Sequence, residues 1–498
     1  MDEDVGPAEG GHPRRWWILI AICASLLIVV VDNTVLSVAL PAIAEAFEAG
    51  TATLQAVVDA YVVVFAGLLV AAGVAADRFG RRRMLLCGLV VFAVASTVAG
   101  LAGTAAVLIA ARAMMGIGAA LVMPATLAIL VQIFPERERP RAFAAWAAVA
   151  AVAMAGGPVL GGLLVELWSW AGVFWINVPL ALAAAAVAAV LTPESHDPDA
   201  RHLDVASAVL ITLGMSGLVL TVLVLGEGSS PALALGAGLV AVSGLGWFAR
   251  RQLRSPDPMV EFTLYRDPRF AGGSAAAAVL TLGTGSALFV LTQYLQLVRG
   301  QSALVAGAAL APLAAGVVVG STAGGRAPDR IGPRACIIAG FAGVTTGFAL
   351  LAFLGPTSTY PHVSAGLALL GLGAGFSSPA VTSVVLEAVP RHRAGMGSAL
   401  HDTHQQLGIA LGVATIGAVL SAVYRSELHV HTGIDDGSLA LTLLRGDPEI
   451  TRAGVDAFLT AQSTTMFIAA GCAAAGAVIA ALTLTNPRNA PPIDVPSA

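Results

Sequence analysis

Four charged side chains interrupt long apolar stretches of the sequence, and their types suggest chemistry. They are Asp32, Asp59, Arg112 and Asp402. A charge at the centre of a membrane helix costs about 2.5–3.5 kcal/mol on insertion scales, so each is a functional candidate by default. A carboxyl group in such a place can exchange protons near neutral pH. We therefore expect acids that bind protons or cations, and a guanidinium group that pairs with one of them.

Asp32 and Arg112 are expected at similar depths in two different helices. At the helical rise, they lie about 12 Å and about 10 Å from the ends of their apolar runs. We predict that Arg112 pairs with Asp32 or caps backbone carbonyl groups. A pair that opens and closes would couple protonation to conformation. The alternatives are a permanent structural pair and, for Asp32, a structural carboxylate bonded to a neighbouring helix.

The other two acids have less certain surroundings. Asp59 lies one turn into its run, where it is either an interfacial residue or a second anionic site for cationic compounds. Asp402 belongs to the polar segment 401–406, His-Asp-Thr-His-Gln-Gln, which must face the protein interior or a cavity. Here a His–Asp pair would relay protons, with Gln405 as a substrate-binding candidate, or the segment is structural polar packing. We expect no metal, because positions i, i+1 and i+3 do not share one helix face.

The composition of the chain indicates that these segments lie in a lipid bilayer. The chain has 498 residues, of which 57% are hydrophobic and 11% charged, and its mean hydropathy is +0.84. Ordinary soluble domains carry about a quarter charged residues. Soluble enzymes, nucleic-acid binders and secreted disulfide scaffolds are therefore excluded. Because no nucleophile, nucleotide-binding loop or metal-ligand set is recognisable, we expect neither enzyme activity nor a cofactor.

Fourteen apolar runs are long enough to cross a bilayer, which takes about 20 residues. They are 16–40, 54–75, 84–103, 105–131, 143–165, 171–192, 206–226, 231–249, 270–297, 303–323, 335–354, 363–387, 396–424 and 463–485. All 26 basic residues are Arg, and 21 fall on one side of this arrangement. By the positive-inside rule that side is the cytoplasm and holds both termini. Segment 425–462 is then a long outer loop.

An internal repeat suggests how the helices are grouped. The segment 73–82 recurs as 325–334, with every matched residue 252 positions further on. Parallel repeats of two bundles, with the substrate path between them, are a common design of secondary transporters. We predict an all-α integral membrane protein with two pseudo-symmetric six-helix bundles at 1–192 and 270–498. Two inserted helices and a cytoplasmic linker occupy 193–269.

Four short motifs occur in order along the chain, at 32–41, 73–83, 112–118 and 156–162. On these motifs the chain resembles the major facilitator superfamily, specifically its fourteen-helix drug:proton antiporter branch. Segment 73–83 resembles the motif between helices 2 and 3, and 112–118 the helix 4 motif of proton-coupled members. Segment 156–162 resembles the antiporter motif of helix 5, and 32–41 the helix 1 motif of this branch. The resemblance covers nearly the whole chain.

The resemblance implies roles for two groups of residues. The first is a charge-relay latch that closes the cytoplasmic side, made of Gly73, Asp77, Arg78, Gly80, Arg81 and Arg82. The second is a tightly packed helix pair that blocks leak, made by Gly157, Pro158, Gly161 and Gly162. The alternatives are a positive-inside anchor for the first group and a merely well-packed kink for the second.

Within the branch, the chain resembles the quaternary-ammonium and dye efflux pumps. The resemblance rests on the acid Asp59 near Tyr61, and on the acid Asp402. Ala56, Met115 and Gln405 depart from the usual Trp, Gln and Arg, which bears on substrate range more than on mechanism. Aromatic candidates for drug stacking are Tyr61, Phe65, Phe289, Tyr294 and Phe376. Ordinary packing is the alternative for each of them.

These observations together lead to a functional expectation. We expect a monomeric, proton-coupled multidrug efflux antiporter of a prokaryotic inner (plasma) membrane, working by alternating access. Its partners would be protons, the lipid bilayer, and drugs, dyes or quaternary ammonium cations, with Asp32, Asp59 and Asp402 binding the cation. The alternatives are a dedicated exporter of one endogenous metabolite, antibiotic or lipid, and a receptor or regulator that does not transport.

Overall fold

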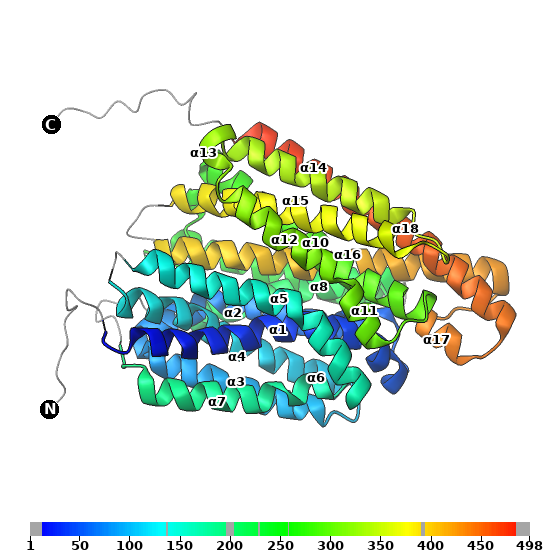
Figure 1. The fold of residues 1–498 in the computed structure, drawn as a ribbon, viewed down its shortest axis with the longest axis horizontal. Coiled ribbons are helices and arrows are strands. Elements are labelled where there is room, and N and C mark those ends of the chain that lie inside the picture. Colours follow the sequence, from blue (N-terminus) through cyan, green and yellow to red (C-terminus); the bar gives the residue numbers. More distant parts are fainter. Residues whose placement is uncertain are drawn as a thin grey trace.

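The computed structural model describes residues 12–135, 138–195, 204–227, 230–256, 258–389 and 394–484. Every regular element among them is a helix (Figure 1). The long helices are α1 Arg15–Phe47, α2 Thr51–Phe79, α3 Arg81–Gly100, α4 Ala105–Ile133, α5 Arg139–Leu167, α7 Asn177–Leu191, α8 Val205–Glu227, α9 Pro231–Arg254, α10 Pro268–Gln293, α12 Ala311–Gly324, α14 Pro333–Ala352, α15 Tyr360–Glu387, α16 Ala394–Thr432 and α18 Pro448–Thr483. Short elements are α6 Gly172–Trp175, η1 Phe262–Arg266, η2 Tyr294–Val298, α11 Ala303–Ala309, α13 Pro328–Ile331 and α17 Leu439–Leu444.

The fourteen expected spans all coincide with helices. Thirteen helices of the described chain are long and apolar enough to cross a membrane, with α6–α7, α10–η2 and α11–α12 each forming one span. The remaining expected span lies in α5, where the described apolar stretch, Gly156–Leu167, is shorter. All fourteen apolar runs of the sequence are therefore helical, and thirteen of them meet the length and hydropathy needed to cross a membrane within the described residues.

One expectation is wrong. The segment 425–462 is not an extended loop, because α16 continues to Thr432, α17 follows, and α18 begins at Pro448. Asp447 caps α18 by accepting hydrogen bonds from the backbone N–H groups of Glu449 and Ile450. Helices that extend beyond the bilayer lose the apolar signal on which the span boundaries rested.

Most of the helix packing lies within the first or the last part of the chain. In the first part of the chain α4 packs against α2 and α3, and α1 against α5. In the last part α15 packs against α12 and α14, and α10 against α16. Contacts between the two parts join α2 to α16 and α5 to α11. Helix α8 packs against its neighbour α9 and also against both α2 and α16, so it contacts both parts of the molecule.

Two glycines of the internal repeat adopt matching backbone conformations. Gly80, after α2, has a φ of 109°, and Gly332, after α13, has a φ of 82°. Both lie in the region that favours glycine, because a Cβ atom there is strained. The repeat in the sequence thus specifies the same turn twice.

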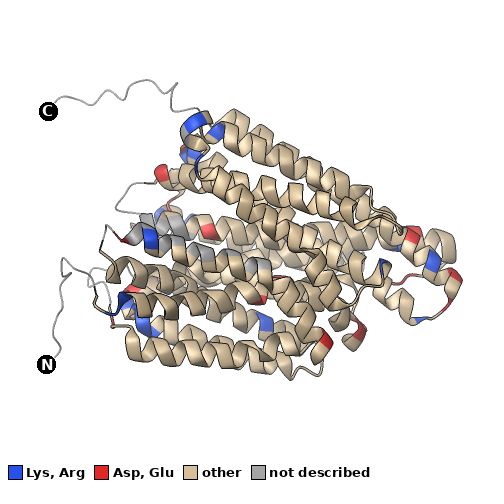
Figure 2. Cartoon of the chain, in the orientation of Figure 1, with Lys and Arg blue, Asp and Glu red and all other residues tan. Residues whose placement is uncertain are grey.

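Charged residues gather at the two ends of the helices (Figure 2). Helix α1 begins, and α18 ends, at the same end (Figure 1). We name it the arginine-rich end, and it includes Arg81, Arg251 and Arg334. The other end carries α17 and is named the α17 end.

Candidate functional site

Asp32 of α1 and Arg112 of α4 form a buried ion pair. Arg112 Nη1 lies 2.5 Å from Asp32 Oδ2, and the two side chains are 0% and 2% exposed. The predicted contact is therefore present. Such a pair is expensive to desolvate, so it persists only with further hydrogen bonds.

Those hydrogen bonds come from three other helices. Asn177 Nδ2, on α7, donates to Asp32 Oδ1 at 2.8 Å and to Ser96 Oγ of α3 at 3.2 Å. Arg112 Nε donates to the carbonyl oxygen of Val57 on α2 at 3.2 Å. The pair thus holds five helices of the first part of the chain in one arrangement.

An aromatic ring completes the surroundings of the cation. The guanidinium carbon of Arg112 lies 4.4 Å from the centre of the Tyr61 ring, and Tyr61 is 0% exposed. A desolvated cation over an aromatic face gains about 2 kcal/mol. Tyr61, which we considered as a drug-stacking residue, is here a neighbour of Arg112.

Asp59 is buried within the protein. It is 2% exposed, and neither carboxylate oxygen has a hydrogen-bond partner among the described residues. Gln55, one turn earlier on the same face of α2, donates from Nε2 to the carbonyl oxygen of Val413 on α16 at 3.2 Å. Asp59 is therefore a buried acid on the face of α2 that approaches α16.

The polar segment around Asp402 is held from several directions. His401 Nε2 lies 3.1 Å from Thr382 Oγ1 on α15, and His404 Nε2 lies 2.8 Å from the Tyr265 hydroxyl on η1. Thr281 Oγ1, on α10, donates to the carbonyl oxygen of Gln405 at 2.8 Å. Through these contacts the two imidazoles face Thr382 and Tyr265, so a direct His–Asp relay gains no support. Within the described chain no group of three or more His, Cys, Asp or Glu side chains is arranged to hold a metal.

The other aromatic candidates lie in helix interfaces. Phe65, Phe289 and Tyr294 are at most 2% exposed, and the Tyr294 hydroxyl donates to the carbonyl oxygen of Gly355 at 2.8 Å. Phe376, on α15, is half-buried, and its backbone lies against Gly320 and Gly324 of α12. In this arrangement of the helices Phe65, Phe289 and Tyr294 are packing residues, whereas Phe376 also lines a hollow of about 230 Å³.

The glycines around Pro158 allow three helices to approach closely. Gly157 and Gly161 face Thr34 and Val35 of α1, where an added Cβ atom would overlap. Gly162 faces the backbone of Ala303 on α11, and Gly307 of α11 faces the carbonyl oxygen of Pro158 in return. The α5–α11 crossing joins the two parts of the chain toward the α17 end, where Ser302 Oγ also donates to Glu166 Oε2 at 3.1 Å.

The charged segment 77–83, at the junction of α2 and α3, contacts a residue that the sequence analysis did not predict. Arg81 pairs with Asp77 at 2.9 Å, one turn away. Glu194, which follows α7, accepts from the backbone N–H of Arg82 at 3.2 Å and lies 3.5 Å from Arg83 Nε. Its carboxylate fills the space where a Cβ atom of Gly80 would lie. These contacts all lie within the first part of the chain, and the role of the loop as a latch stays a prediction.

The predicted residues form separate groups. Asp32 and Arg112 meet directly, whereas no direct contact joins this pair to Asp59 or Asp402 among the described residues. Sequence reasoning missed Asn177, Ser96 and Glu194. Asn177 could have been found, because it is a polar residue in the apolar run 171–192. The Val57 carbonyl could not, because a backbone acceptor leaves no mark in the sequence.

Comparisons with known proteins agree on one family. The sequence profile of the Major Facilitator Superfamily matches residues 22–413. The multidrug efflux pump LfrA of Mycolicibacterium smegmatis is 35% identical over 430 residues, which are 86% of this chain and 85% of the relative. The tetracenomycin C resistance and export protein of Streptomyces glaucescens is 31% identical over 421 residues, or 84% of this chain and 78% of the relative.

The fold also resembles a solved transporter. A bacterial homologue of the human lysosomal transporter Spinster, in an inward-facing and unoccupied conformation, superimposes with a TM-score of 0.69. The match covers 96% of this chain and 100% of the other, at 19% sequence identity. At that identity the similarity establishes the fold.

Proposed function

The chain belongs to the major facilitator superfamily, and we propose that it is a proton-coupled multidrug efflux antiporter for lipophilic, chiefly cationic, compounds. The observation that carries efflux is the 35% identity, over 86% of the chain, to a protein named a multidrug efflux pump. Its long apolar helices and bacterial relatives make it a multi-pass protein of the prokaryotic inner membrane. In this proposal it acts as a monomer, needs no cofactor, and is a transporter, not an enzyme.

The buried pair of Asp32 and Arg112 supports proton coupling. Protonation of Asp32 would remove the charge that Arg112 Nη1 contacts, while the hydrogen bond from Asn177 to the carboxyl group can persist. Arg112 would then retain the Val57 carbonyl and the Tyr61 ring, both on α2. Releasing α1 from α4 while α4 stays attached to α2 would turn protonation into a relative movement of helices.

Two acids that lack cationic partners support a preference for cations. Asp59 is buried and Asp402 is half-buried. Neither has an ion pair among the described residues, and they lie on α2 and α16, in different parts of the chain. A lipophilic cation would supply the missing countercharge. Export of one positive charge against a negative interior requires about 2.3 kcal/mol per 100 mV, which proton entry can supply.

A cellular assay tests efflux itself. The protein is produced in bacteria that lack their own dye pumps, and ethidium accumulation is followed in energised cells before and after a protonophore. We expect lower accumulation than in cells with an empty vector, and loss of this difference on addition of the protonophore. Equal accumulation with and without the protein, at verified membrane levels, would refute dye efflux.

A dedicated exporter of one antibiotic is the second candidate, because one relative is named for resistance to and export of tetracenomycin C. Resistance tests with a panel of unrelated lipophilic cations and neutral antibiotics separate the two candidates. Protection against many cations supports the multidrug proposal, and protection against a single compound supports the dedicated exporter. A receptor or regulator would protect against none and show no flux.

A further inference from the structure

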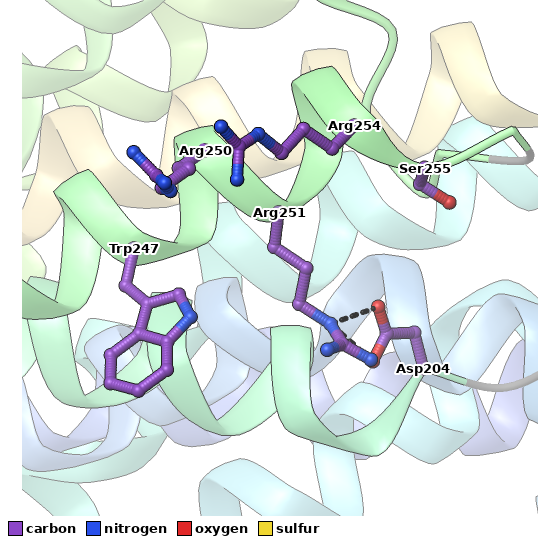
Figure 3. Close-up of a pocket in the computed structure, with 6 residues that line it drawn as sticks. All are labelled: Asp204, Trp247, Arg250, Arg251, Arg254 and Ser255. Carbon is purple, nitrogen blue, oxygen red and sulfur yellow. Dashed lines mark hydrogen bonds and ion pairs between the residues drawn. The ribbon is translucent and has the colours of Figure 1, made fainter.

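The inserted helices carry a basic hollow at the arginine-rich end of α9. Its volume is about 380 Å³, and Figure 3 shows the side chains that line it. They are Asp204, Trp247, Arg250, Arg251, Arg254 and Ser255. The Trp247 side chain is 65% exposed, so the hollow opens on the surface of the molecule and belongs to none of the groups described above.

Only one of the three arginines is neutralised within the described chain. Arg251 makes a forked pair with Asp204, with Nε 2.9 Å from Oδ2 and Nη2 3.0 Å from Oδ1. The hydrogen bonds from Arg251 lower the pKa of Asp204 to about 2, so this acid stays ionised. Arg250 and Arg254 have no acidic partner among the described residues, which do not include Asp257.

The two remaining guanidinium groups approach the same space. Figure 3 shows Arg254 extending back along α9 toward Arg250, on the side of the helix away from Asp204. Like charges in one hollow repel each other, whereas an anion that lies between them attracts both. Guanidinium groups donate in a forked geometry that matches phosphate oxygens. The chemistry of the hollow is therefore that of a phosphate site.

Hydrogen bonds to neighbouring segments fix the backbone of this site. Gln252 is 3% exposed, and its Nε2 donates to Ser207 Oγ of α8 at 2.7 Å. Its Oε1 accepts from the backbone N–H of Val260 at 3.1 Å. Ser207 Oγ in turn donates to Asp204 Oδ2 at 2.6 Å. The last turn of α9 is thus held before any ligand binds, which reduces the entropic cost of binding.

The surface that leads to the hollow is apolar. Leu235, Leu239 and Val242 are 66%, 62% and 75% exposed, and their helical spacing places them on the face of α9 that ends at Arg250. Trp247 lies at the level where aromatic side chains meet lipid headgroups. An aqueous anion would make no use of this stripe, whereas the acyl chains of a lipid would cover it.

We propose that Arg250 and Arg254, beside Trp247, bind the phosphate group of an anionic membrane lipid whose acyl chains lie along α9. By the positive-inside rule this lipid belongs to the cytoplasmic leaflet. The site lies on α9, which packs against α8, and α8 contacts both α2 and α16. It is independent of the transported compound.

Native mass spectrometry of the full chain, released from detergent with added phosphatidylglycerol, measures the lipids retained per molecule. We expect one retained phosphatidylglycerol in the wild type that is lost in the variant Arg250→Gln/Arg254→Gln. Each single substitution should weaken binding about fivefold, which corresponds to about 1 kcal/mol per basic residue near an anionic lipid. If the double variant fails to fold, the weaker lipid binding expected of each single variant tests the proposal.

The matched control is Arg326→Gln/Arg330→Gln, which removes two charges at the same end of the molecule but outside the hollow. Retention unchanged in this control supports a specific site. Equal loss in both double variants would overturn the proposal in favour of general charge attraction, and equal retention of phosphatidylethanolamine would overturn the anionic headgroup. Inorganic phosphate that displaces the lipid at millimolar concentration would identify free phosphate as the ligand and overturn the lipid.

Discussion

The guanidinium group of Arg112 stacks on the ring of Tyr61, 4.4 Å from its centre. Among the described residues the Tyr61 hydroxyl makes no well-formed hydrogen bond, although the Asn33 side chain lies near it. The ring therefore contributes through its face and its volume. We predict that Tyr61→Phe behaves like the wild type, whereas Tyr61→Leu lowers the free energy of unfolding by about 2 kcal/mol and slows transport. Thermal unfolding and ethidium efflux check both variants, and equal damage by Phe and Leu would contradict this role.

The close crossing of α5 and α11 leads to a prediction with a control in the same helix. A Cβ atom at Gly162 would overlap the backbone of Ala303, whereas one at Gly156 meets nothing within 4 Å. Overpacking of this kind costs about 1–3 kcal/mol. We expect Gly162→Ala to reduce efflux about tenfold at unchanged membrane levels, and Gly156→Ala to leave it intact. Efflux equally reduced by both substitutions would argue against a specific role of this crossing.

The Asp59 carboxylate is expected to contribute to the recognition of cationic compounds and not to the free energy of unfolding. Its carboxylate oxygens accept no hydrogen bond from the described residues, so an amide in their place breaks no contact there. We predict that Asp59→Asn folds as well as the wild type and loses protection against cationic dyes at least about fivefold, on the order of 1 kcal/mol. Resistance to neutral compounds should remain. Equal loss for neutral and cationic compounds would rule out a role in charge recognition.

The pair of Asp204 and Arg251 predicts a pH-dependent contribution to stability. The hydrogen bonds from Arg251 hold the folded-state pKa of Asp204 at about 2, below the ordinary value of 3.8. A lowered folded-state pKa adds stability that is fully present above pH 3.8 and disappears as the pH falls through 2. The pair is partly exposed, at 47% and 21%, so solvent screening keeps its contribution to the free energy of unfolding small.

Unfolding of Asp204→Asn in detergent checks this sign. The variant should be less stable than the wild type at pH 6, and the difference should shrink toward pH 2. Asp456→Asn, at an exposed position on α18, serves as the control and should show no such trend. Asp204 Oδ1 also accepts a hydrogen bond from the backbone N–H of Ser207, at the start of α8. A difference that is constant with pH would mean that this hydrogen bond, and not the charge, is responsible.

The sequence predicted those features that depend on apolar length and on rare charges. Spans were placed correctly because lipid demands uninterrupted apolar helices, and the Asp32–Arg112 contact was predicted because two buried charges need each other. The turn at Gly80 was also foreseeable, since its repeat at Gly332 fixes the same backbone. Features of this kind are local in the chain or follow from a strong energetic penalty.

Other features depend on which helices pack against each other, and this pairing could not be predicted from one sequence. The bond from Asn177 to Asp32 spans 145 positions, and the closure of Gly80 by Glu194 joins segments on either side of five helices. The lengths of α16 and α18 were underestimated, because polar surface beyond the bilayer has no periodic signal strong enough to mark a helix. The aromatic candidates were chosen by residue type, which does not distinguish a packed ring from one that lines a substrate path.

The most direct test of the account is proton counterflow in proteoliposomes. Purified protein is reconstituted with an imposed pH gradient, and ethidium movement and internal pH are recorded together for the wild type, Asp32→Asn and Asp456→Asn. We predict that the gradient drives dye movement with matching proton flow in the wild type and in Asp456→Asn, and that both are lost in Asp32→Asn. Gradient-driven dye and proton movement in a correctly folded Asp32→Asn variant, at the wild-type rate, would contradict the central claim that the buried pair of Asp32 and Arg112 couples the two fluxes.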